Sequence, residues 1–142
     1  MTTSGRATGI ALALVATALA PGAAIAQPCG AAIAGDRRIA ESGRYVVAYA
    51  TSPSPVEVGR HFVVDFAVCP RDGAAAAEAV RVDATMPEHR HGMNYRAAVT
   101  TTGPGRFRAE GLLFHMPGRW DLSFDVAARG ATEPVTAVLR VE

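Results

Sequence analysis

Histidine and methionine are concentrated in two short segments of this 142-residue chain. Residues 86–93 read MPEHRHGM, and the second segment is His115-Met116. Apart from the initiator, these segments hold every methionine and all but one of the histidines. Methionine sulfur favours Cu(I), and imidazole nitrogen accepts copper in both oxidation states. The composition therefore predicts a copper site, with Cu(I) favoured, Cu(II) acceptable and zinc the weaker alternative.

Six residues are candidate ligands, and some have an alternative role in the fold. Met86 continues an apolar row with Val80 and Val82, so core packing explains it as well as copper binding does. His89 and His91 lie in a polar turn beside a glycine, and their alternative is a solvated loop. The full candidate set is Met86, His89, His91, Met93, His115 and Met116.

The remaining candidates flank turns. Met93 either binds metal or packs under its loop, and neither interpretation is preferred. His115 and Met116 adjoin a turn, where strand alternation places Met116 on the core side. The fourth histidine, His61, is interpreted as a surface residue, and Trp120 as a core aromatic without a further function.

The elements that must position these side chains are strands. Apolar and polar residues alternate along most of the chain, with turn signals between the runs. A bulge at Gly111 restores the alternation of the strand that contains it. This pattern predicts an all-β fold, an immunoglobulin-like β-sandwich of about seven strands. The expected strands cover residues 45–50, 61–69, 80–86, 95–100, 106–115, 120–126 and 135–141.

Strand direction places the two ligand segments together. If consecutive strands alternate in direction, the strands ending at Met86 and at His115 run the same way. Their following loops then lie at one pole of the sandwich, and His61 begins a strand near that pole. We therefore expect nitrogen and sulfur ligands from separate segments to meet there.

The N-terminus is typical of an exported protein. Arg6 precedes an apolar run over 10–20 and a small-residue cleavage site, so residues 1–26 are expected to be a cleaved signal peptide. Residues 27–43 then form an N-terminal extension, and 44–142 the sandwich. We expect a periplasmic or secreted protein with no membrane anchor after cleavage. In such an oxidising compartment Cys29 and Cys69 favour a disulfide.

Charge and motifs exclude several functions. The formal net charge of +1 argues against a nucleic-acid partner recognised by electrostatics. The chain has no GxSxG nucleophile elbow, and its cysteines are expected to be oxidised, so an enzyme is not expected.

Four stretches together resemble the YtkA-like and FixH-like exported β-sandwich domains. They are residues 56–62, 86–93, 105–107 and 114–122, and the resemblance extends over about 44–142. CopC-like periplasmic copper carriers are a more distant comparison. The resemblance implies an immunoglobulin-like fold and a role in copper handling or in the assembly of copper-containing oxidases.

The family's motif falls on five of the candidate ligands: Met86, His89, His91, Met93 and Met116. The leading hypothesis is accordingly an exported copper-binding protein, a metallochaperone or buffer, that exchanges the ion with a copper-acceptor or envelope protein. The alternative is a non-metal interaction module of the bacterial envelope, such as an assembly accessory for a membrane complex.

Overall fold

The structure is a computed structural model that describes residues 1–2 and 27–142. The signal peptide expected over 1–26 falls almost wholly on residues 3–26, which lie outside the described part of the chain. The described residues form nine strands and no helix, and hence no helix long and apolar enough to cross a membrane. The all-β prediction is confirmed.

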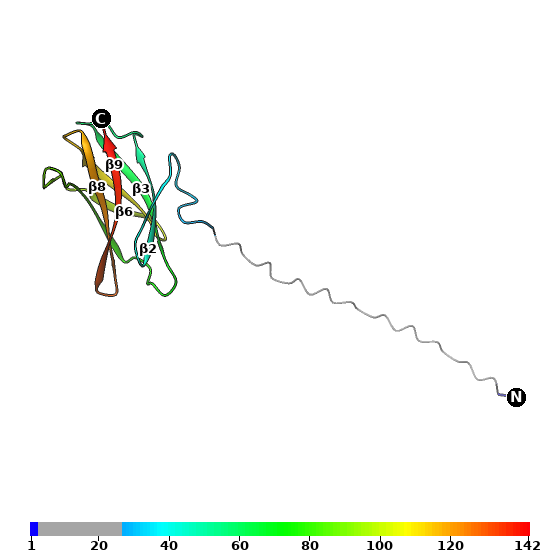
Figure 1. The fold of residues 1–142 in the computed structure, drawn as a ribbon. Helices are drawn as coiled ribbons and strands as arrows, with labels where there is room; N and C mark the ends of the chain where they lie inside the picture. The colour runs from blue at the N-terminus through cyan, green and yellow to red at the C-terminus, as the bar shows by residue number, and fades with distance from the viewer. Residues whose placement is uncertain (3–26) are drawn as a thin grey trace.

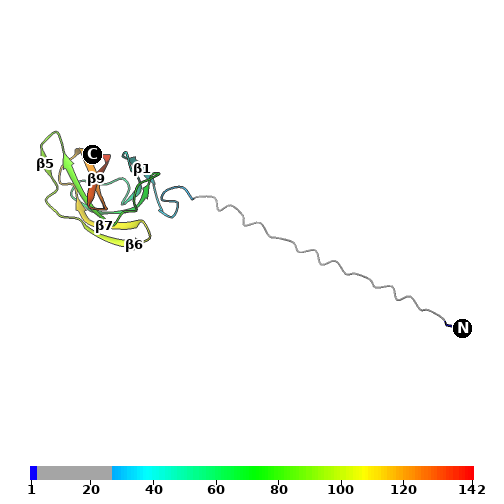
Figure 2. The ribbon, with the colours of Figure 1, turned by 90° about the horizontal axis from the view of Figure 1, so that it is seen from below.

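The strands form two antiparallel sheets (Figure 1). The first sheet has the spatial order β1 (Arg38–Glu41), β2 (Tyr45–Ser52), β3 (His61–Pro70), β7 (Arg106–Leu113) and β6 (Ala98–Gly103). The second has the order β5 (His91–Gly92), β4 (Ala79–Met86), β8 (Gly118–Ala128) and β9 (Ala131–Val141). Strands β1 and β5 lie on opposite sides of the molecule (Figure 2).

One hydrophobic core fills the space between the sheets. Alternation along β8 buries every second side chain from Trp120 to Ala128, and β4 buries a matching row that ends at Met86. Phe124 of β8 contacts both Tyr49 and Phe66 of the other sheet, with ring centroids 5.6 and 4.9 Å apart. These contacts across the layers identify the fold as a β-sandwich.

All seven expected strands are present, and β1 and β5 are additional. The sequence does not reveal these two because β5 has two residues and β1 buries only Ala40. Several boundaries differ from the prediction: β7 ends at Leu113 rather than at His115, and β9 begins at Ala131 rather than at residue 135. Strand β6 begins at Ala98 rather than at Tyr95, whose exposed ring lies against His61 with centroids 5.1 Å apart.

The predicted bulge is confirmed. Phe62 of β3 pairs with Leu112 of β7, and Val64 pairs with Ala109. Two residues of β3 are thus separated by one residue while their partners on β7 are separated by two, so β7 carries one extra residue there. Gly111 lies in this interval with a φ of 80°, a left-handed conformation that glycine adopts readily. The bulge keeps Ala109 and Leu112 both buried.

The two ends of the sandwich differ in chemistry. Strand β8 begins where β9 ends, since Gly118 pairs with Val141. The C-terminus marked in Figure 1 therefore lies at the end where β4 finishes and β8 begins. We call this end the histidine pole; it comprises the 87–90 loop, β5, the 114–117 turn and the start of β3, where His61 pairs with Leu113.

Candidate metal centre

The first wall of the histidine pole is the hairpin between β4 and β5. Met86 and His91 are direct cross-strand partners, and such partners project from the same face of a sheet. Met86 is fully buried, so that face is the inner one, and His91 is half-buried beside it. The His89 amide donates to the Met86 carbonyl at 3.2 Å, and Arg90 adopts a φ of 55° to close the loop.

The second wall is the turn between β7 and β8. The amide of Gly59 donates to the carbonyl of Phe114 at 2.8 Å and holds the chain beyond the end of β7. His115 follows, half-buried. Its ring centroid lies 4.9 Å from that of His91, so the two segments meet at one pole as strand direction predicted.

The two facing imidazoles each carry a buried nitrogen without a partner. Among the described residues, His91 Nε2 and His115 Nδ1 are the buried side-chain polar atoms that make no hydrogen bond. The other nitrogen of His91, Nδ1, lies 3.1 Å from the Gly92 carbonyl oxygen. That carbonyl can only accept, so in the neutral ring Nδ1 carries the proton and Nε2 presents its lone pair. Metal-binding histidines are commonly held in this way.

Trp120 forms the floor beneath the imidazole pair. Its indole is fully buried and stacks on Phe114, with centroids 4.5 Å apart and planes 7° from parallel. The rings of His91 and His115 approach it edge-wise, at 5.7 and 5.5 Å. Trp120 Nε1 donates to the Met116 carbonyl at 3.0 Å, which ties the floor to the turn.

Sequence reasoning assigned Trp120 no role beyond the core, yet it contacts both imidazoles. The signal available in the sequence was its position, since it follows directly on the turn that carries His115 and Met116. The apolar indole of Trp120 excludes water from one side of the imidazole pair. A nitrogen there that makes no hydrogen bond therefore costs more folding free energy.

The methionines occupy different depths. The methyl end of Met86 extends to the backbone at Gly118, beneath the turn that carries His115. Met93 and Met116 are half-buried and pack against the core. The Met93 amide also donates to the Ala84 carbonyl at 3.2 Å. Met86 thus lies next to His91 as its cross-strand partner, with its methyl end at the start of β8.

Two histidines stand apart from the buried pair. His89 is exposed, and its ring centroid is 5.9 Å from that of His91. His61 is also exposed and lies against Tyr95. Neither has a buried unpartnered nitrogen.

The donor set at the pole is two imidazoles with a thioether nearby. Over residues 1–2 and 27–142, no three His, Cys, Asp or Glu side chains are grouped as a metal centre would need. A closed zinc site built from four such ligands is therefore absent from this part of the chain. Soft sulfur with imidazole instead fits copper, above all Cu(I), which accepts few ligands.

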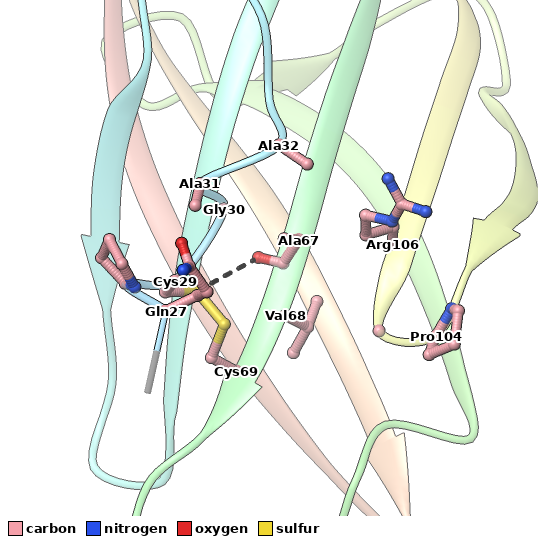
Figure 3. A pocket seen from close by; sticks show the side chains of 12 residues that line it. Gln27, Cys29, Gly30, Ala31, Ala32, Ala67, Val68, Cys69, Pro104 and Arg106 are labelled. Carbon is pink, nitrogen blue, oxygen red and sulfur yellow. Dashed lines mark hydrogen bonds between the residues drawn. A yellow bond between two sulfur atoms is a disulfide. The ribbon is translucent and has the colours of Figure 1, made fainter. Parts of the chain in front are cut away.

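The cysteines are in a disulfide at the other end of the molecule. Cys29 is bonded to Cys69, near the end of β3, and the described part of the chain has no free cysteine (Figure 3). A cavity of about 460 Å³ lies beside this bond, lined by residues 27–32, by β3 and by the turn before β7. No histidine or methionine lines it, so it is separate from the candidate metal centre.

Comparison with known proteins gives one family. The sequence model of a family described as YtkA-like matches residues 39–125, from β1 into β8. The match includes every candidate ligand. No curated protein and no solved structure shows significant similarity to the chain. Because the match spans more than half of its length, the chain belongs to the YtkA-like family.

Proposed function

We propose that this protein is an exported copper carrier that binds one Cu(I) ion at the histidine pole. Its nitrogen ligands are His91 Nε2 and His115 Nδ1, and its sulfur ligand is the thioether of Met86. The single observation that carries the proposal is the pair of buried, unpartnered imidazole nitrogens on rings 4.9 Å apart.

Leaving these nitrogens unpartnered has an energetic cost. A buried polar atom without a partner destabilises the fold by about 1–3 kcal/mol. One ion between the two rings would satisfy both nitrogens. Metal–imidazole bonds are about 2 Å long, so ring centres that share an ion lie about 5–6 Å apart. The observed separation of 4.9 Å is at the lower limit of this span.

Donor softness favours Cu(I) over zinc and Cu(II). Zinc sites use three or four N, O or thiolate ligands, and a thioether is a poor substitute. Both cysteines are bonded to each other and lie away from the pole. With Met86 as the third donor, the set matches the preference of Cu(I) for sulfur and imidazole.

The location of the site supports a carrier rather than a store. Both imidazoles are half-buried, one on the two-residue strand β5 and one on the 114–117 turn, so the site lies close to the surface at one end of the sandwich. The disulfide supports an oxidising compartment outside the cytoplasm. The expected partner is a copper-acceptor protein of the periplasm or envelope.

The experiment is an anaerobic titration of the disulfide-bonded protein with Cu(I), in competition with a chelator. Trp120 is the only tryptophan and lies against both imidazoles, so its fluorescence reports occupancy. Loss of an outer-shell partner alone costs 10–100-fold in metal affinity, so His91→Ala/His115→Ala should lose at least about a hundredfold.

Two further variants make the test specific. Met86→Leu conserves core volume and should change stability by less than about 1.5 kcal/mol. If the thioether is a ligand, this variant weakens Cu(I) binding about tenfold, or about 1.4 kcal/mol. His61→Gln, at an exposed histidine of the same pole, should bind like wild type. Wild-type binding no tighter than that of the double alanine variant would overturn the proposal and favour the interaction module.

A further inference from the structure

Three imidazoles form a row from the solvent to the interior of the histidine pole. The ring centroids of His89 and His91 are 5.9 Å apart, and those of His91 and His115 are 4.9 Å apart. The planes of neighbouring rings differ by 37° and 33°. Exposure falls along the row, since His89 is exposed whereas His91 and His115 are half-buried.

His89 differs from the other two in what its ring contacts. The buried nitrogens belong to His91 and His115, and in the described part of the chain the His89 ring makes no hydrogen bond to protein. Its backbone is nevertheless fixed, because its amide donates to the Met86 carbonyl. The exposed ring thus stands at the rim of the site on a hydrogen-bonded backbone.

Both steps of the row have the spacing of two imidazoles around one ion. With metal–nitrogen bonds of about 2 Å, ring centres that share an ion are about 5–6 Å apart. The ring spacing therefore allows His91 to share an ion with either neighbour. The outer pair includes the exposed ring of His89, whereas both rings of the inner pair are half-buried.

We propose that His89 is the transfer ligand of the site, which takes Cu(I) from a donor or passes it to an acceptor and shares it with His91 on the way. This inference rests on the proposed function. In each step one copper–nitrogen bond forms as another copper–ligand bond breaks, and the ion remains Cu(I) throughout. His89 is absent from the final ligand set, so it changes rates and not the affinity.

The reason for a kinetic effect is the cost of removing a ligand before its replacement is bound. Without His89, the ion must leave His115 before an outside ligand can bind it. A neighbouring imidazole at the rim replaces the lost bond and lowers the barrier in both directions. The bound and free states are unchanged, so both rate constants change by the same factor.

The test is stopped-flow fluorescence of Trp120 with Cu(I) supplied and removed by a chelator. In His89→Gln we expect the rates of loading and of chelator-driven release each to fall about tenfold, with an unchanged Kd. His61→Gln is the matched control, because it removes another exposed imidazole at the same pole by the same substitution. It should keep wild-type rates.

Two results would overturn the inference. One is wild-type rates in His89→Gln, and the other is a loss of affinity as large as that of His91→Gln, which would make His89 a resident ligand. Either result leaves the proposed copper site intact. Failure of the proposed function gives a different result, because the wild-type protein would then not bind Cu(I) tightly at equilibrium.

Discussion

At the scale of residues, the candidate site is defined by two unpartnered imidazole nitrogens and by the space at one glycine. His91 on β5 and His115 on the 114–117 turn are half-buried, and each has one buried nitrogen that makes no hydrogen bond. Met86, the cross-strand partner of His91, extends to Gly118, whose φ of 123° lies in a region that L side chains rarely adopt. A Cβ atom there would come 2.8 Å from Met86 Cε.

Gly118→Ala should therefore both strain the backbone and displace the Met86 thioether. We expect a loss of stability of about 1–3 kcal/mol from backbone strain, with an added cost from the contact. Denaturant unfolding measures the first effect, and Cu(I) affinity should fall with the second.

The matched control is Gly130→Ala, in the turn between β8 and β9. Gly130 also has a positive φ, 74°, but a Cβ there meets no atom within 4 Å. This variant should lose stability through its backbone alone and keep its Cu(I) affinity. Equal affinity in the two variants would show that Met86 does not depend on the space at Gly118.

At the scale of elements, one carboxylate links the two sheets. Glu133 of β9 accepts a hydrogen bond from the Arg44 amide at 2.9 Å and pairs with the Arg44 guanidinium, at the start of β2. Hydrogen bonds from the Ser42 side chain and from Arg44 lower the pKa of Glu133 from 4.5 to about 2. A carboxylate with a depressed pKa stabilises the fold when ionised.

The pH dependence follows from the direction of this shift. The contribution of Glu133 is complete above pH 4.5 and is lost as the pH falls from 4.5 through about 2. Glu133→Gln should therefore be less stable than wild type near neutral pH, and the difference should shrink over this range. Denaturant unfolding between pH 2 and pH 7 checks this. Glu57→Gln, which removes a carboxylate paired with Arg60 inside one turn, should keep the wild-type profile.

At the scale of the whole molecule, chemistry is divided between two ends. His61 begins β3 at the histidine pole, and Cys69 lies near the end of the same strand, roughly 25 Å away along it. The disulfide binds the N-terminal segment to the first sheet there. Neither cysteine can therefore compete with the imidazoles for an ion at the pole.

Removing this bond should destabilise the protein without affecting the metal centre. The bridge closes a sequence separation of 40 residues, which in the chain-entropy account contributes about 4 kcal/mol. Cys29→Ser/Cys69→Ser should lower the free energy of unfolding by about this amount. Its Cu(I) affinity, measured where it remains folded, should be unchanged. Wild-type stability in this variant would contradict the prediction. As a control, added reductant should not change the unfolding curve of the variant, because the variant has no disulfide between these positions to reduce.

The alternation of apolar and polar residues was sufficient to predict the all-β architecture. Alternation has a period of two residues and is set by which face of a strand a side chain leaves, so it predicted the seven main strands and the bulge at Gly111. Strand directions then placed the segments of His91 and His115 at one pole. Short elements such as β1 and β5 have too few residues to show alternation.

Only the tertiary structure decided how the six candidate ligands differ from one another. His89 and His91 are two residues apart in one motif, yet one is exposed and the other has a buried nitrogen. Depth of burial depends on how separate segments pack: Trp120 and Gly118 come from β8, which lies beyond β4 from β5 in the same sheet, and His115 comes from the turn that joins the two sheets. The order of residue types does not predict these depths of burial, because they depend on contacts between strands that are distant in the sequence.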